Sequence, residues 1–173
     1  MSTTLADKRI TTLLDLLAEL TAGHRELRAA VEGKIAAMRA GDPAAIRDAA
    51  LVEQGIAQRL TERENLRRQL TVNIARGYGV GVEAARRMSA AQLAERIGGP
   101  DAERLREAAG GLKALVAEVA RRNHVAELIA QNVLRHVKLA FAAMTAGAQT
   151  TTGYSPGGET RMGANELILD AVG

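Results

Sequence analysis

The chain has 173 residues, of which 47% are hydrophobic but only 2% aromatic, and its formal net charge is +3. This length favours one domain, and an apolar content built from Ala, Leu, Val and Ile favours long packed helices over a β-sandwich or barrel. The absence of cysteine excludes disulfides, thiolate zinc sites and a cysteine nucleophile.

The first predicted helix covers residues 4–40. Its apolar seam alternates steps of three and four residues, which is the heptad pattern of coiled-coil packing. The seam consists of Ile10, Leu13, Leu17, Leu20, His24, Leu27, Val31, Lys34 and Met38. Gly23 and Gly33 each weaken this helix by roughly 1 kcal/mol relative to alanine, so we interpret both as places where a neighbouring helix comes close.

A break at Gly41-Asp42-Pro43 separates this helix from a second one, predicted over residues 43–76. Glycine suits the position after a helix, aspartate caps the next helix, and proline is favoured at its first position. So short a connection predicts an antiparallel hairpin. The apolar positions of the second helix are Ile46, Ala49, Val52, Ile56, Leu60, Leu66, Leu70 and Ile74.

A glycine-rich run, Gly77–Gly81, follows the second helix. A phosphate-binding loop requires a strand before it, so we predict a turn instead. Two helical turns over residues 82–88 come next, and then a short helix over residues 89–97. Ser89 and Gln92 have the spacing of a capping box at the start of that short helix.

A third long helix is predicted over residues 100–146. Small and apolar residues again return at steps of three and four, with Arg122 and His136 in the two polar slots. A second apolar stripe beside the first widens this face beyond what two neighbouring helices can easily cover, so we expect another molecule to bury it. The part that we assign to partner binding comprises Leu128, Ile129, Val133, Leu134 and Leu139.

Together these elements predict an all-α protein. Its bundle would cover residues 1–146, with three long antiparallel helices and a short helical segment between the second and third. Residues 147–173 are rich in glycine and threonine, with one basic and three acidic residues. We predict that they form a flexible tail ending in a short apolar segment at residues 164–172.

No combination of residues predicts catalysis, a cofactor or a metal. The histidines lack the Glu-x-x-His pairs of a di-metal bundle, and His24 and His136 occupy seam positions typical of packing. Basic residues are interspersed with acids, so we expect no nucleic-acid binding. No apolar run reaches the ~20 residues of a membrane span, and the N-terminus does not look like a secretion signal. We therefore expect no membrane insertion and a cytoplasmic protein.

Three groups of scattered residues carry a family resemblance. The first, in the predicted hairpin, comprises Lys34, Met38, Gly41, Asp42, Ile46 and Glu53. The second is Arg122–Ile129 and the third is Tyr154–Gly158. They resemble the hairpin, the Asn-x-x-Asn-x-x-Leu segment and the Tyr-x-x-x-Gly element of the FlgN family of flagellar export chaperones. Asn123 matches the first asparagine, whereas Ala126 stands at the second.

The resemblance implies a chaperone that binds the terminal helices of hook–filament junction proteins, prevents their premature assembly and delivers them to the flagellar export gate. Cargo binding would then use the third helix, around Leu128, together with the tail. We also hypothesise that Tyr154, the lone aromatic residue of the tail, docks on the export gate. The apolar residues Leu167, Ile168 and Leu169 would cover the cargo-binding face when no cargo is bound.

A competing interpretation is a homodimeric coiled-coil scaffold or adaptor without an export cargo. A second copy of the chain would bury the apolar face of the third helix as well as a cargo helix would. Both interpretations account for the sequence.

Overall fold

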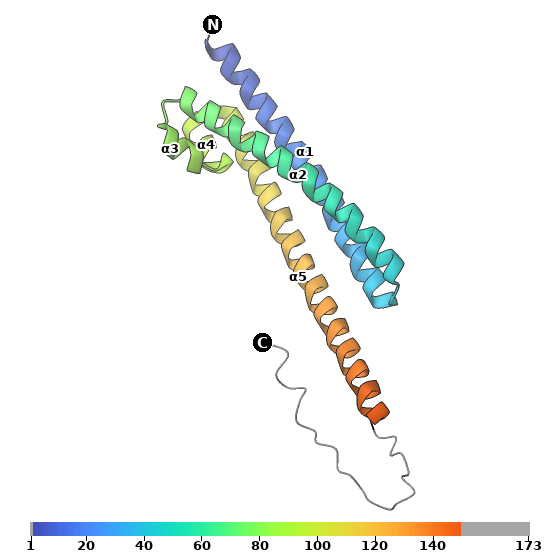
Figure 1. The fold of residues 1–173 in the computed structure, drawn as a ribbon. Coiled ribbons are helices and arrows are strands. Elements are labelled where there is room, and N and C mark those ends of the chain that lie inside the picture. The colour runs from blue at the N-terminus through green and yellow to red at the C-terminus, as the bar shows by residue number, and fades with distance from the viewer. Residues whose placement is uncertain (1, 150–173) are drawn as a thin grey trace, which may run out of the picture. The chain divides into compact units, whose positions relative to one another are not determined.

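The structure is a computed structural model that describes the backbone of residues 2–149 and the side chains of residues 8–146. Within this range every element is a helix, which confirms the predicted all-α fold class (Figure 1). The helices are α1 (Ser2–Ala40), α2 (Pro43–Gly77), α3 (Val82–Arg87), α4 (Ala90–Ile97) and α5 (Gly99–Gln149).

The chain divides into two compact units, residues 1–132 and residues 133–173. The first unit contains α1 to α4 and the first two thirds of α5, and the described part of the second is the remainder of that helix. The predicted tail at 147–173 and its apolar segment at 164–172 fall almost entirely outside the described residues, so the proposed boundary at residue 146 stays a prediction.

The connection between α1 and α2 has the predicted chemistry. Gly41 adopts a φ of 66°, a left-handed conformation that favours glycine. The Asp42 carboxylate accepts hydrogen bonds from the backbone N–H groups of Ala44 and Ala45, each at 3.0 Å, and Pro43 is the first residue of α2. The N-cap and the short turn therefore set the antiparallel hairpin of α1 and α2 (Figure 1).

The predicted turn after α2 and the predicted N-terminal cap of α4 are also confirmed. The run Gly77–Gly81 forms a turn between α2 and α3, with Gly79 in the left-handed region. At the start of α4, Ser89 Oγ accepts a hydrogen bond from the N–H of Gln92 at 3.2 Å, and the N–H of Ser89 donates to Gln92 Oε1 at 2.9 Å. This is the reciprocal pair of a capping box.

The largest hydrophobic cluster of residues 1–132 draws on all five helices. Its buried members are Ile10, Leu13, Leu17, Ile74, Ala75, Val80, Ala85, Ala90, Leu93, Ala94, Ala102 and Leu105. Helices α3 and α4 contribute Ala85, Ala90, Leu93 and Ala94, so this short segment closes the core at the end of α2, where α5 begins.

Two smaller clusters continue along α1. Leu20 packs with Ile56 and Leu60 of α2, and Val31 and Ile35 pack with Ala126 of α5. The N-terminal end of α1 thus meets the start of α5, whereas its C-terminal part meets residues further along α5. Within residues 1–132, α5 consequently runs parallel to α1, and α2 runs antiparallel to both.

The seam predicted for α1 is confirmed, because each of its positions is buried or half-buried. The prediction for α2 is wrong at Val52 and Leu66, which are exposed. Val52 borders a hollow beside Ala29 and Ala30 of α1, whose short side chains leave it uncovered. Leu66 does not face the core, because Glu64, Arg67 and Thr71 take the inward positions of this part of α2.

The two glycines of α1 behave differently. A Cβ atom at Gly23 would lie 2.7 Å from Leu60 Cδ2, so this glycine does mark a close helix approach. A Cβ atom at Gly33 would meet nothing within 4 Å, and the same prediction is wrong there. Gly33 is exposed, and no packing requirement offsets its low helix propensity.

Alanine substitutions should separate these two cases. We expect Gly33→Ala to raise the free energy of unfolding by about 0.5–1 kcal/mol, because alanine loses less conformational entropy in a helix. Gly23→Ala should gain less or destabilise, since overpacking a core costs about 1–3 kcal/mol. Urea unfolding of both variants measures the difference, and equal stabilisation would contradict the close approach of Gly23 and Leu60.

Candidate protein-binding surface

Helix α5 packs on the core along one side and is exposed along the other. Within residues 99–132, Leu105, Val119 and Ala126 are buried at steps that follow the predicted stripe. On a neighbouring stripe, Val116 and Val125 are exposed. The predicted widening of the apolar face is therefore present in this helix.

Exposure is greatest in residues 133–146, where every described side chain is exposed. The exposed fraction is 50% at Val133 and 73% at Met144. This stretch contains Arg135 and Lys138 but no acidic residue. The large apolar side chains that it exposes are Val133, Leu134, Val137, Leu139, Phe141 and Met144. We call this set the α5 apolar face. An apolar surface of this kind marks a site for a partner molecule.

The residues that the sequence assigned to partner binding fall into two groups. Leu128, Val133, Leu134 and Leu139 are exposed. Ile129 differs, because it is half-buried and packs against the cluster that contains Val31, Ile35 and Ala126 of the core. The binding role of all five stays a prediction. Tyr154 and the residues Leu167, Ile168 and Leu169 lie outside the described residues.

Sequence reasoning missed three members of the α5 apolar face. Val137, Phe141 and Met144 follow Val133 at intervals of 4, 8 and 11 positions, which places them on one broad side of a helix. That spacing is a sufficient signal, but these three residues lie outside the two apolar stripes predicted for the helix.

Ion pairs attach α5 to α1 within residues 1–132. Arg122 Nη1 lies 2.9 Å from Glu32, and Glu118 lies between Arg28 at 3.2 Å and Arg122 at 3.4 Å. Burial raises the pKa of Glu118, but hydrogen bonds from Arg28 and Arg122 outweigh it and leave the pKa below its usual value. Arg122 thus occupies a position of the apolar stripe, as predicted, while its guanidinium reaches the carboxylates of Glu32 and Glu118 at the edge of the helix.

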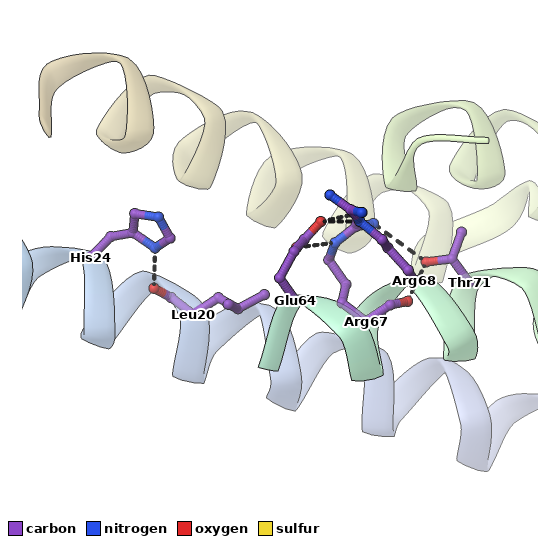
Figure 2. A network of polar contacts seen from close by, with 6 residues as sticks. All are labelled: Leu20, His24, Glu64, Arg67, Arg68 and Thr71. Carbon is purple, nitrogen blue, oxygen red and sulfur yellow. Dashed lines mark hydrogen bonds and ion pairs between the residues drawn. The ribbon is translucent and has the colours of Figure 1, made fainter. Parts of the chain in front are cut away.

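A second polar network lies on α2 (Figure 2). Arg67 holds Glu64 with two hydrogen bonds of 2.7 Å, from Nε and Nη2, and Arg68 Nε donates to the same carboxylate at 3.0 Å. Arg67 Nη1 also reaches the hydroxyl of Thr71 at 3.5 Å, and that buried hydroxyl donates to the Arg67 carbonyl at 2.8 Å. These mutual contacts allow polar residues to take the inward positions of α2.

This network makes stability depend on pH. The hydrogen bonds from Arg67 lower the pKa of Glu64 in the folded protein, despite the opposing effect of burial. A glutamate with a lowered folded-state pKa stabilises the protein above its unfolded pKa of about 4.3 and loses that contribution as the pH falls through the folded value. We expect Glu64→Gln to lower the free energy of unfolding by about 0.5–1 kcal/mol at neutral pH.

Urea unfolding of the wild-type protein and Glu64→Gln between pH 3 and pH 7 measures this contribution. The difference between the two proteins should shrink below about pH 4. Glu62→Gln is the matched control, because Glu62 is an exposed carboxylate on the same helix, and its effect should stay below about 0.5 kcal/mol. A difference for Glu64→Gln that does not vary with pH would contradict this account.

Two of the three histidines make local contacts. His24 Nδ1 lies 2.8 Å from the Leu20 carbonyl, and His124 Nδ1 lies 3.5 Å from Glu127. Among the described residues, His, Cys, Asp and Glu form no group that could hold a metal ion. None of the helices that the structure describes combines the length and the hydropathy that a membrane span requires.

The described residues define an all-α protein of the helical-bundle class, whose long last helix exposes apolar side chains. Comparison with protein families identifies which one: the family described as FlgN protein matches residues 1–162. The chain therefore belongs to the FlgN family of flagellar export chaperones, and the resemblance seen in its scattered residues is confirmed. No curated protein and no solved structure matches the chain.

Two residues that carried the resemblance meet in the structure. Lys34 of α1 and Glu53 of α2 form an ion pair across the hairpin, and both side chains are mostly buried. Their pairing joins α1 and α2 in the part of the hairpin that leads to the turn at Gly41. A structural role in the hairpin therefore accounts for this part of the resemblance.

Proposed function

We propose that this protein is a cytoplasmic export chaperone that binds the terminal helices of hook–filament junction proteins through the α5 apolar face. Binding would prevent premature assembly of the cargo before its delivery to the flagellar export gate. The observation that carries this proposal is the continuous exposure of large apolar side chains over residues 133–146 in a member of the FlgN family.

The chemistry of this face supports a helical cargo. An amphipathic helix buries apolar residues at helical spacing against such a surface, and each fully buried Leu, Val or Phe contributes about 1.5–3 kcal/mol. Arg135 and Lys138 lie in the same stretch, which favours a cargo helix with acidic residues beside its apolar stripe.

The C-terminal residues complete the proposal. Leu167, Ile168 and Leu169 would cover the α5 apolar face before cargo arrives, and Tyr154 would contact the export gate. Support comes from the sequence, in which a short apolar segment follows a polar stretch with a single aromatic residue. Removal of residues 150–173 should preserve the helix content of residues 1–146. A loss of cooperative melting would instead show that these residues belong to the core.

Size-exclusion chromatography with light scattering tests the chaperone proposal. The protein is measured alone and then with the terminal segments of hook–filament junction proteins. A stoichiometric complex whose mass increases by one cargo segment would support cargo binding. A stable dimer that binds none of these segments would favour the homodimeric scaffold and reject the proposed cargo.

A further inference from the structure

We propose that the outer side of the α1–α2 hairpin binds a second copy of this chain and forms a four-helix bundle with it. The two helices lie side by side (Figure 1). Between them two adjoining hollows share Glu26, Ile56 and Arg59 among their lining residues. We call these hollows together the hairpin groove. No described residue of α5 lines it, so self-association here is separate from cargo binding by the α5 apolar face.

Large apolar side chains stand beside small ones at one end of the hairpin groove. Leu51 and Val52 of α2 are 61% and 56% exposed. Together with Ala29 and Ala30 of α1 they line a hollow of about 550 Å³. Each hairpin therefore offers both an apolar projection and a recess next to it, and two identical surfaces can fill such recesses for each other.

The hairpin groove has an acidic edge on α1 and a basic edge on α2. Arg59 Nη2 lies 3.1 Å from Glu26 Oε2, and Arg63 Nε lies 3.1 Å from Glu19 Oε2. All four side chains line the groove and are more than half exposed, so both pairs remain accessible to charges from another chain. A partner helix with charges of one sign would be repelled at one edge, whereas a partner that has the same two edges can match both.

A two-fold axis along the hairpin groove matches the charges and the apolar side chains together. It turns a second hairpin face to face with the first, so that α1 of each copy lies over α2 of the other at the same height. Because Glu26 and Arg59 are level with each other within one chain, Glu26 of one copy then faces Arg59 of the other. The same rotation places Leu51 of one copy over Ala29 and Ala30 of the other. All neighbouring helices are antiparallel, as in up-down four-helix bundles.

Charge disfavours two other occupants that this chain offers. The apolar segment at residues 164–172 contains Glu166 and Asp170 but no basic residue, so it would bring acids to the acidic edge on α1. Residues 133–146 contain basic but no acidic residues, so two copies of the α5 apolar face would bring like charges together. The hairpin groove, in contrast, carries both signs in an arrangement that complements itself.

Sedimentation velocity of the full-length chain tests the dimer. From Leu51 to Arg63 the groove extends about 18 Å at 1.5 Å per residue, which is short for an interface. We therefore expect a weak dimer with a Kd on the order of 10 µM, whose sedimentation coefficient rises as the concentration increases from about 1 to about 200 µM. A chain that stays monomeric over this range would overturn the inference.

Single substitutions locate the interface. Leu51→Asp should weaken dimerisation by at least about 50-fold, because each copy would bury an unpaired carboxylate against apolar side chains. Arg59→Glu should weaken it by about tenfold, because like charges would then face each other. The matched controls are Gln54→Asp and Arg47→Glu, which alter exposed residues of α2 outside the hairpin groove and should leave dimerisation unchanged.

A mixture of two charge variants tests the pairing of α1 with α2. Arg59→Glu has two acidic side chains at this level of the groove and Glu26→Arg has two basic ones, so each should dimerise poorly by itself. Mixed in equal amounts, they should form a heterodimer at least as stable as the wild-type dimer, because every facing pair then has opposite charges. Failure to form this heterodimer, with circular dichroism showing that both variants are folded, would overturn the arrangement.

The same measurements distinguish the hairpin groove from the other surfaces. Phe141→Asp should leave dimerisation unchanged, and Leu51→Asp should leave cargo binding unchanged. A dimer that is lost in Phe141→Asp but kept in Leu51→Asp would move the contact to the α5 apolar face. A dimer that is lost when residues 150–173 are removed would move it to the C-terminal segment. Either result would overturn the inference.

Discussion

Replacement of Leu105 by alanine is expected to lower the free energy of unfolding by about 3–5 kcal/mol. Leu105 is fully buried in the cluster to which all five helices contribute, so its removal leaves a cavity that the neighbouring helices cannot all close. Because small proteins are stable by only about 5–15 kcal/mol, this single change would remove a large share of the total. Urea unfolding followed by far-UV circular dichroism measures the effect.

Leu134→Ala is the matched control for this prediction. It makes the same chemical change on the same helix, but at a side chain that is 55% exposed, so its effect should stay below about 0.5 kcal/mol. Similar destabilisation by the two substitutions would mean that Leu134 has a packing partner, and it would weaken the case for a free α5 apolar face.

The second large effect is expected on binding. Phe141→Asp should abolish detectable complex formation with the terminal segment of a hook–filament junction protein and leave the free energy of unfolding nearly unchanged. Phe141 is 68% exposed, so the folded chain tolerates a charge there. Burial of that unpaired carboxylate beneath a cargo helix would cost about 3–5 kcal/mol, which is more than a 100-fold loss of affinity.

Isothermal titration calorimetry with the wild-type protein, Phe141→Asp and Phe141→Leu tests this prediction. Phe141→Leu keeps an apolar side chain at the position and should retain most of the affinity. Leu51→Asp places the same charge on an exposed residue of α2 and should bind cargo normally. Normal binding by Phe141→Asp would exclude this part of α5 from the cargo site, while membership of the FlgN family would be unaffected.

The sequence predicts α1 well because its signal is simple. Its seam from Ile10 to Met38 follows one spacing without interruption, and both neighbouring helices pack against that same stripe. The ends of α2 and α4 are equally predictable, because the caps at Asp42 and Ser89 depend on residues only two or three positions away. Local chemistry determines these features, so a single sequence is enough.

The middle of α2 could not be predicted in the same way. A count of apolar residues directs Leu66 inward, but Glu64, Arg67 and Thr71 take the inward positions because they satisfy one another's hydrogen bonds. Charged residues on a helix usually face water, and the pattern of charges does not reveal which of them will pair. Only three-dimensional contacts distinguish this network from an ordinary solvated helix face.

The candidate sites show the same difference between features that depend on neighbouring residues and features that depend on contacts between distant parts of the chain. The sequence pointed to Val133, Leu134 and Leu139 of the α5 apolar face, since the apolar width of one helix is a local property, but not to Val137, Phe141 or Met144. The half-burial of Ile129 could not be read from the sequence, because its neighbours, Val31 and Ile35, lie almost 100 positions earlier in the chain. The hollow lined by Leu20, Leu60 and Val116 was not predictable either, because residues of three separate helices line it.

The position of α1 between two later helices also determines the order in which the chain can fold during synthesis. Its hairpin partner α2 follows directly, but Leu105, which completes the cluster around Ile10, follows 95 positions later. At about 5–20 residues per second, the ribosome needs roughly 5–20 s to supply it. Throughout that interval the cluster around Ile10 lacks Ala102 and Leu105, so the nascent chain exposes apolar surface that the finished fold buries.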